Sequence, residues 1–167
     1  MCGAELLSLP EGVQRVARVL QDKGHPHGPQ MLEVAARTAQ EAADALGIVV
    51  GQIAKSIIFR RKSDDACVLV ITSGDCRVDE TKVAALVGPV GRADADFVKA
   101  RTGFAIGGVS PVGHRQAPSA LLIDEELLTL GDVYAAAGSP FAIFRTTGAE
   151  LAAATGGQVA NIKEDAA

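Results

Sequence analysis

Aromatic residues are scarce in this sequence. They make up 4% of its 167 residues, and tryptophan is absent. A surface that stacks successive nucleic-acid bases on aromatic rings is therefore not expected. Hydrophobic residues still account for 48% of the chain and charged residues for 22%, which is typical of a globular domain. The core must consequently be built mainly from Val, Ile, Leu and Ala.

Cysteines and histidines are too few and too scattered to form a recognisable metal site. The three cysteines, Cys2, Cys67 and Cys76, are odd in number and show no CxxC spacing, which argues against a disulfide framework and a zinc site. His25 and His27 lie two residues apart, but a metal site would need further ligands. Phosphate-loop and dinucleotide fingerprints are also missing. We therefore expect no metal and no cofactor.

Positive charge is in short supply, with 16 Lys and Arg against 20 Asp and Glu, a net charge of −4. Proteins that bind nucleic acid by broad phosphate neutralisation are normally basic. We therefore expect no DNA binding, and any contact with RNA should be small, local or assisted by a partner. No apolar run approaches the ~20 residues that cross a bilayer, and the N-terminus lacks a signal-peptide pattern. A cytoplasmic protein without a membrane partner is expected.

The length suits one compact domain, residues 1–167, with a core from about residue 13 to residue 165. Periodicity, capping residues and Gly/Pro breaks predict helices or helical turns at Glu11–Lys23, Thr38–Gly47, Asp79–Val87, Asp94–Arg101, Glu125–Leu130 and Thr147–Ala154. Apolar runs bounded by turn residues predict strands at Met31–Val34, Lys55–Arg60, Cys67–Thr72, Phe104–Ile106, Ala120–Ile123, Phe141–Phe144 and Gln158–Ile162. Because helices and strands alternate irregularly, an α+β (mixed α/β) fold is favoured over a doubly wound one.

Lys55 is the first candidate functional residue. It opens an apolar strand and is flanked by Ile53 and Ile57. A lysine among buried residues is costly unless its ammonium group finds a partner or reaches an opening. Lys55 is thus either a binding-site residue or a lysine that extends to solvent at the end of a strand.

The second feature is a glycine-rich segment, Thr102–His114, which contains four glycines and a proline. Its centre, Gly107–Pro111, is called the glycine loop below. Glycines allow a close approach of the backbone to a ligand, and successive free N–H groups can hold a carbonyl oxygen or an oxyanion. An ordinary tight connection is the alternative. Ser110 is not expected to be a nucleophile, because the Gly-x-Ser-x-Gly pattern fails at Val112.

Three segments together resemble the YbaK family, which belongs to the superfamily of the prolyl-tRNA synthetase editing domain. They are Gln52–Phe59, Thr102–His114 and Leu121–Asp124. The resemblance extends from about Val13 to Asp165 and is closest to the free-standing editing proteins. It implies a mixed, barrel-like sheet with surrounding helices and a cleft between them.

The resemblance also implies an activity, the hydrolysis of the ester that joins an amino acid to the terminal adenosine of tRNA. In this family the lysine, here Lys55, engages the tRNA terminus. The backbone of the glycine loop, with Gly107 and Gly108 at its centre, faces the substrate carbonyl. Water attacks with help from a ribose hydroxyl. The further substrate-binding residues implied are Thr38, Phe104, Val109, Ser110, Pro111, His114, Asp124 and Ile143.

The expected substrate is tRNA for proline that carries alanine or 2-aminobutyrate, because the strand Phe141–Phe144 is apolar where some relatives have a polar residue. Walls from Ile143, Phe141 or Phe104 would leave a hydroxyl or thiol without a partner. The partners implied are the aminoacyl-tRNA acceptor end and a prolyl-tRNA synthetase or elongation factor that could deliver it. Two alternatives remain: a non-catalytic module that binds the tRNA end, and a hydrolase of another small acyl ester.

Overall fold

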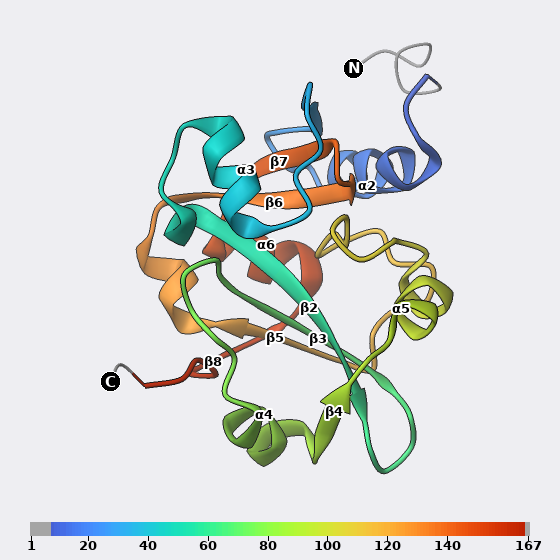
Figure 1. Cartoon of the computed structure of the whole chain (residues 1–167), viewed down its shortest axis with the longest axis vertical. Helices are drawn as coiled ribbons and strands as arrows, with labels where there is room; N and C mark the ends of the chain where they lie inside the picture. The colour runs from blue at the N-terminus through green and yellow to red at the C-terminus, as the bar shows by residue number, and fades with distance from the viewer. Residues whose placement is uncertain (1–7, 166–167) are drawn as a thin grey trace.

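The computed structural model describes residues 8–165. Its centre is one mixed sheet in the order β1-β7-β6-β2-β3-β5-β8, and a further strand, β4, also pairs with β2 (Figure 1). The strands are β1 (Gln30–Met31), β2 (Ile53–Arg61), β3 (Cys67–Ser73), β4 (Val90–Arg92), β5 (Ala120–Asp124), β6 (Asp132–Ser139), β7 (Ala142–Thr147) and β8 (Gln158–Ala160). Parallel and antiparallel pairs alternate irregularly, since β2 is antiparallel to β3 but parallel to β6. The mixed α/β fold class is confirmed.

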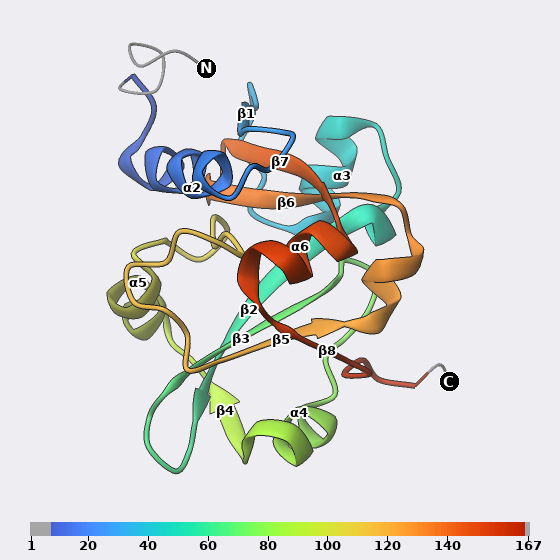
Figure 2. The ribbon, with the colours of Figure 1, turned by 180° about the vertical axis from the view of Figure 1, so that it is seen from behind.

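Helices surround this sheet (Figure 2). The α-helices are α2 (Glu11–Asp22), α3 (Ala39–Leu46), α4 (Glu80–Val87), α5 (Ala95–Thr102) and α6 (Gly148–Thr155), with 3-10 turns η1 (Val50–Gln52) and η2 (Glu125–Thr129). The predicted caps Thr38, Asp79, Asp94 and Thr147 each accept a hydrogen bond from the first turn of their helix. These side chains satisfy otherwise free N–H groups, which is why the helices begin where the sequence indicates.

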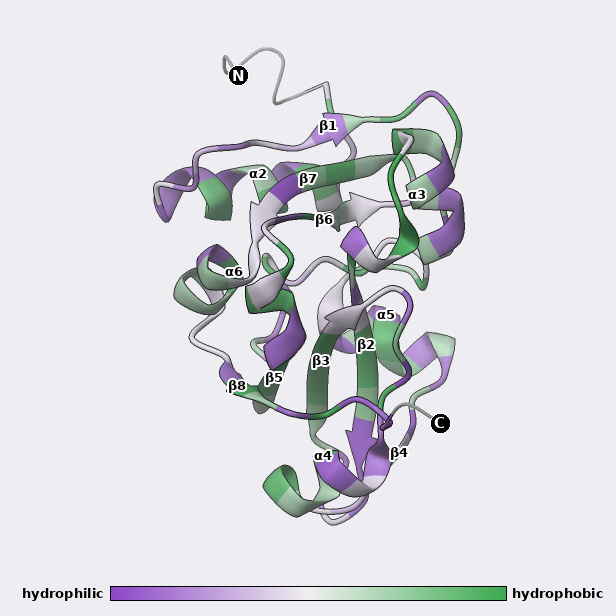
Figure 3. Cartoon of the chain, turned by 90° about the vertical axis from the view of Figure 1, so that its left-hand side faces the viewer, coloured by the Kyte–Doolittle hydropathy of each residue, from purple (hydrophilic) through white to green (hydrophobic). Residues whose placement is uncertain are grey.

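The core lies on both faces of β3, whose seven residues are all buried. Leu69 and Ile71 belong to the larger cluster, together with Val13 and Val16 of α2. Val68 and Val70 face a second cluster that includes Val83 of α4. The uninterrupted apolar run thus corresponds to a strand covered on both sides, as predicted. Figure 3 shows this hydrophobic character along the middle of β2 and β3, with a hydrophilic end of β2 beside β4.

Two strands were not predicted, and each has a weak local signal. The segment of β6 reads DVYAAAGS, and its alanines and glycine have low strand propensity. The three residues of β4 include Gly91 and are held by pairing with β2. Both strands depend on partners far away in the sequence, which a local pattern does not reveal.

Three strand predictions need correction. Phe104–Ile106 is not a strand, because Gly103 adopts a left-handed conformation and the Phe104 amide donates to the Thr102 side chain. The first strand is β1, Gln30–Met31, rather than Met31–Val34, and the last strand ends at Ala160. Within residues 8–165, no helix is both long and apolar enough to cross a membrane.

Candidate active site beside strand β2

Two adjoining cavities form a cleft along β2. The first has a volume of about 300 Å³ and the second of about 570 Å³. Both are lined by the same central residues, Ser56, Ile57, Ile106, Gly107 and Val109. The middle of β2 and the start of the glycine loop therefore form walls that the two cavities share.

The first cavity holds the predicted site residues Thr38, Lys55, Gly107, Val109 and Ile143. The remainder of its wall is mostly small and apolar, and comes from α3, the segment before it, β6 and β7: Ala36, Ala39, Ala42, Ala135, Ala136 and Ala142. Alanine side chains leave space between elements that larger residues would fill. A small apolar group would fit against this part of the wall.

Lys55 lies in the wall of the first cavity, about as the sequence predicts. Burial lowers its pKa from 10.5, nearby Cys76 and Asp75 raise it, and Arg77 lowers it further. No carboxylate among residues 8–165 lies within ion-pair distance of its ammonium group. A partly desolvated cation without a protein partner is well suited to bind an anionic or polar group of a substrate.

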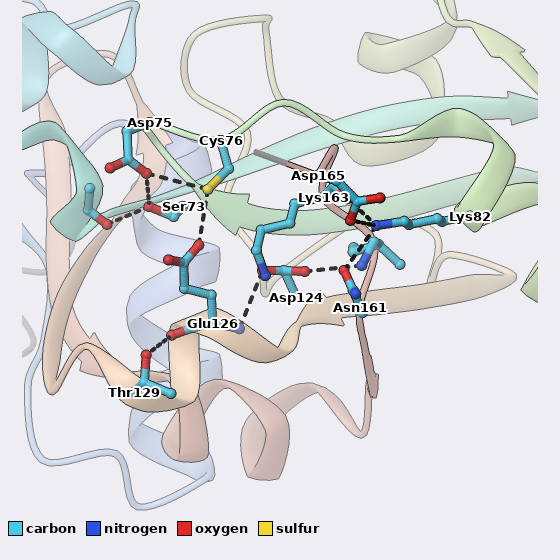
Figure 4. Close-up of polar contacts among 12 residues, drawn as sticks. Ser73, Asp75, Cys76, Lys82, Asp124, Glu126, Thr129, Asn161, Lys163 and Asp165 are labelled. Atoms are coloured by element: carbon cyan, nitrogen blue, oxygen red, sulfur yellow. Dashed lines mark hydrogen bonds and ion pairs between the residues drawn. The ribbon is translucent and has the colours of Figure 1, made fainter. Parts of the chain in front are cut away.

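The carboxylates of Asp75 and Glu126 accept hydrogen bonds from neighbouring side chains (Figure 4). Ser73 donates to Asp75 at 2.8 Å, and the Cys76 thiol donates to Glu126 at 3.0 Å. Burial and the hydrogen bond to Glu126 raise the pKa of Cys76 to about 12, so the sulfur stays a thiol at neutral pH. Asp75, Cys76 and Glu126 lie within 4.8 Å of one another, and their mutual hydrogen bonds account for this arrangement.

The glycine loop contributes backbone rather than side chains to the cleft. Gly107 has φ +95°, and a Cβ there would lie 3.2 Å from the Arg37 side chain. Gly108 packs so closely on β6 that a Cβ would lie 2.9 Å from the Ser139 backbone. Its amide donates to the Ala105 carbonyl at 3.0 Å, whereas the amides of Gly107 and Val109 donate to no other described residue. Within the glycine loop, Gly107 and Val109 therefore line the cleft and have amides without a hydrogen-bond partner among the described residues.

Four predicted binding residues instead brace the loop and do not line either cavity. Ser110 is buried; its hydroxyl accepts from the Val112 amide, and its carbonyl lies 2.6 Å from His114 Nε2. The His114 ring packs edge-on against buried Phe104. Burial lowers the pKa of His114. Pro111 is buried in the same segment. These contacts give the four residues a role in holding the loop, without direct access to a ligand in the cleft.

Asp124 is likewise away from the cleft walls. Its side chain is fully buried and accepts from the amides of Glu126 and Ile162. It therefore joins η2 to the chain that follows β8, a structural contact. Phe141, proposed as a pocket wall, is 40% exposed and lines neither cavity.

Several cleft residues were missed from the sequence, namely Arg37, Ser56, Arg77, Arg92, Ile106 and Tyr134. Ser56 follows Lys55 on β2, and its buried hydroxyl has no hydrogen-bond partner among the described residues. In the sequence, only its position next to Lys55 could have pointed to Ser56 as a cleft residue. Arg77 and Arg92 line the second cavity and come from segments that only the fold brings together.

The chemistry of the first cavity follows from its wall. That wall contains one ammonium group, the guanidinium of Arg37, hydroxyls and free amides, but no carboxylate, imidazole or thiol. A nucleophile activated by a neighbouring base requires such groups. The arrangement is better suited to polarising a carbonyl and binding its oxygen.

Comparison with known proteins connects this site to a family. The model of the aminoacyl-tRNA editing domain matches residues 33–154. The uncharacterised protein YwhH of Bacillus subtilis (strain 168) is 32% identical over 120 residues, 71% of this chain and 75% of that protein.

Two solved structures also resemble this chain over most of its length. A protein described as a candidate trans-editing enzyme for prolyl tRNA synthetase is 43% identical, with a TM-score of 0.86 and coverage of 94% of this chain and 99% of that one. The hypothetical protein APE2540 is 30% identical, with a TM-score of 0.82 and coverage of 90% and 99%. Since the matched residues 33–154 include Lys55 and the glycine loop, this chain belongs to the aminoacyl-tRNA editing domain family.

Proposed function

We propose that this protein is a trans-acting hydrolase that removes a wrongly attached amino acid from tRNA, with tRNA for proline carrying alanine or 2-aminobutyrate as its substrate. One observation carries the proposal. The unpaired ammonium of Lys55 and the free amides of the glycine loop line the same cavity, whose remaining wall is mostly apolar and rich in alanine. A cation, amide donors and a small apolar pocket are the groups needed to bind a short aminoacyl ester of a polyanion.

In this mechanism water attacks the ester carbonyl carbon, and the oxyanion that forms accepts hydrogen bonds from the amides of Gly107 and Val109. The C–O bond to the ribose then breaks, and the ribose oxygen takes up the proton that the attacking water loses. The neighbouring ribose hydroxyl of the substrate relays this proton, because the cavity wall offers no carboxylate or imidazole. Lys55 holds the tRNA terminus so that the ester reaches the loop.

Side-chain size sets the preference for the amino acid. One methylene in a pocket is worth only ~1–3 kcal/mol, so attraction alone discriminates weakly. Walls from Ile53, Ala142 and Ile143 admit an unbranched short chain, whereas the ring of proline would overlap them. The unpartnered hydroxyl of Ser56 also offers a hydrogen bond that the sequence had not indicated, so seryl esters should be closer competitors than expected.

A panel of charged tRNAs tests the proposal. Transcripts of tRNA for proline carrying alanine, 2-aminobutyrate, serine, cysteine or proline are incubated with the protein, and release of each amino acid is followed. Alanine and 2-aminobutyrate should be released fastest and proline spared. Binding of charged tRNA without release of any amino acid would instead support the non-catalytic alternative.

Substitution of Lys55 tests the site itself. Lys55→Ala should remain folded and lose about 100- to 1000-fold in rate, the usual effect of removing one preorganised electrostatic contact. Lys23→Ala, at an exposed position after α2, is the matched control. Near-normal release by Lys55→Ala would contradict the assignment.

A further inference from the structure

One edge of β2 is uncovered in the middle of the cleft. Strand β6 pairs with β2 only at Ile53 and Ala54, and β4 pairs with it only at Phe59–Arg61. On the opposite edge, β3 covers β2 continuously from Ala54 to Arg60. Within the described part of the chain, residues Lys55–Ile58 therefore have no strand partner on the side of β6 and β4.

Hydrogen bonds at both ends of β2 show which backbone groups face this gap. The carbonyl of Ile53 accepts from Gly74 at 2.7 Å, and the amide of Arg61 donates to Ala66 at 2.9 Å. Odd-numbered residues of β2 thus direct their backbone groups toward β3. Lys62, an even-numbered residue, donates to Pro89 on the β4 side at 2.8 Å. By this alternation, the amide and carbonyl of Ser56 and the amide of Ile58 face the uncovered edge.

These backbone groups lie at the junction of the two cavities. Ser56 lines both cavities, and Ile58 lines the second. Ile57 and Ile106 also line both, and Ile106 is 57% exposed despite its apolar side chain. A flat group bound at this edge could therefore contact apolar side chains while it hydrogen-bonds to the strand.

We infer that this edge binds the adenine base of the terminal nucleotide that carries the ester. In a parallel sheet, one residue of the partner strand bridges the carbonyl of residue i and the amide of residue i+2 with its own N–H and C=O. Adenine has the same adjacent donor and acceptor, its 6-amino group and N1. The Ser56 carbonyl accepts from the amino group, and the Ile58 amide donates to N1.

The chemistry of the neighbouring groups supports this occupant. The inference rests on the proposed function, in which Lys55 of β2 holds the tRNA terminus while the ester lies at the glycine loop, and the nucleoside is covalently attached to that ester. Enzymes that bind an unstacked base commonly combine hydrogen bonds to its edge with apolar contacts to its faces. Guanine and uracil present the acceptor and donor in the reverse order, which would oppose carbonyl to carbonyl; cytosine presents the same order as adenine.

Substrate analogues test the two hydrogen bonds one at a time. Acceptor-stem minihelices end in adenosine, 1-deazaadenosine, N6,N6-dimethyladenosine or 7-deazaadenosine, and all carry the amino acid that the panel shows to be released fastest. The 1-deaza and dimethyl esters should lose about five- to tenfold in kcat/KM, the usual effect of one lost hydrogen bond. The 7-deaza ester, which keeps both groups, should match adenosine. Equal rates for all four esters would overturn the inference.

A binding measurement separates this inference from the proposed function. Titration with AMP should shift the backbone amide resonance of Ile58, whereas the amide of Leu151, buried in α6, should not move. Ile106→Ala should weaken AMP binding several-fold, and Val159→Ala, at another exposed apolar side chain, should not. If AMP moves Ile58 but no charged tRNA is hydrolysed, only the proposed function fails. If hydrolysis occurs and saturating AMP leaves Ile58 unmoved, the adenine site fails.

Discussion

Burial determines when Lys55 carries its charge. Its folded-state pKa is below 10.5 because the cavity wall desolvates the ammonium group. The protonated form is therefore less favourable in the folded protein than in the unfolded chain, and the resulting cost in folding free energy disappears as the pH rises from the lowered pKa toward 10.5. If Lys55 binds the tRNA terminus as proposed, this cost in stability accompanies its role in binding.

The lowered pKa of Lys55 predicts how the rate of deacylation changes at alkaline pH. If the proposed role is correct, deacylation should decline as the pH rises through the lowered pKa of Lys55, because the neutral amine cannot hold the tRNA terminus. Lys55→Arg keeps the charge and should move the decline to higher pH. The measurement is the single-turnover rate from neutral to alkaline pH, corrected for spontaneous ester hydrolysis. A wild-type profile that stays flat to pH values above 10.5 would refute a charged Lys55 in the reaction.

The backbone of Gly107 allows a second residue-scale prediction, with Gly131 as its control. Both have positive φ, +95° and +69°, but a Cβ at Gly131 would meet nothing within 4 Å. Alanine at either position should cost about 1–2 kcal/mol through left-handed strain. Only Gly107→Ala should also slow deacylation, because its Cβ presses on Arg37 in the cleft wall. Thermal unfolding and deacylation rates of the two variants distinguish the effects, and equal rates would argue against a role for this amide.

Strand β2 organises the site at the level of elements, and only part of its role could be predicted from the sequence. Its apolar pattern and the position of Lys55 are local, and both were predicted. Its partners β4 and β6 contact it across long stretches of chain, so the gap between them at Ser56 could not be predicted. Gly107 and Val109, to which the family motif points, line the cleft, but the motif does not distinguish residues that line the cavity from residues that brace the loop, such as Ser110 and His114.

Two identical helix caps allow the role of Thr38 to be isolated. Thr38 and Thr147 each accept a hydrogen bond from the amide of a glutamate three residues later, at 3.1 Å in both cases, but only Thr38 lines the first cavity. Alanine at either position should cost about 1 kcal/mol of stability. Only Thr38→Ala should lower kcat/KM, and Thr38→Ser should restore it. If Thr147→Ala impairs deacylation equally, the effect of Thr38 is one of folding alone.

The distribution of charge over the whole molecule explains how an acidic protein could bind an RNA end. The net charge of −4 opposes broad contact with a polyanion. Arg77 and Arg92 nevertheless line the second cavity together with one carboxylate, Glu80, and neither arginine makes an ion pair with a carboxylate of residues 8–165. Strand β2 leads from the first cavity into the second. If the terminal nucleotide of the tRNA binds beside Lys55, the phosphates that precede it would therefore lie near these arginines.

Salt dependence measures this contact. Each phosphate neutralised by an arginine contributes about −1 to the slope of log affinity against log salt concentration. Arg77→Ala and Arg92→Ala should therefore each weaken binding of a charged minihelix and make that slope shallower by about 1, while hydrolysis of the same amino acid from a single aminoacyl-adenosine should be unaffected. Arg18→Ala, on α2 away from both cavities, should change neither quantity. If all three variants retain the wild-type slope, the polyanion does not follow the second cavity, and the acceptor end must approach Lys55 from the side of α3.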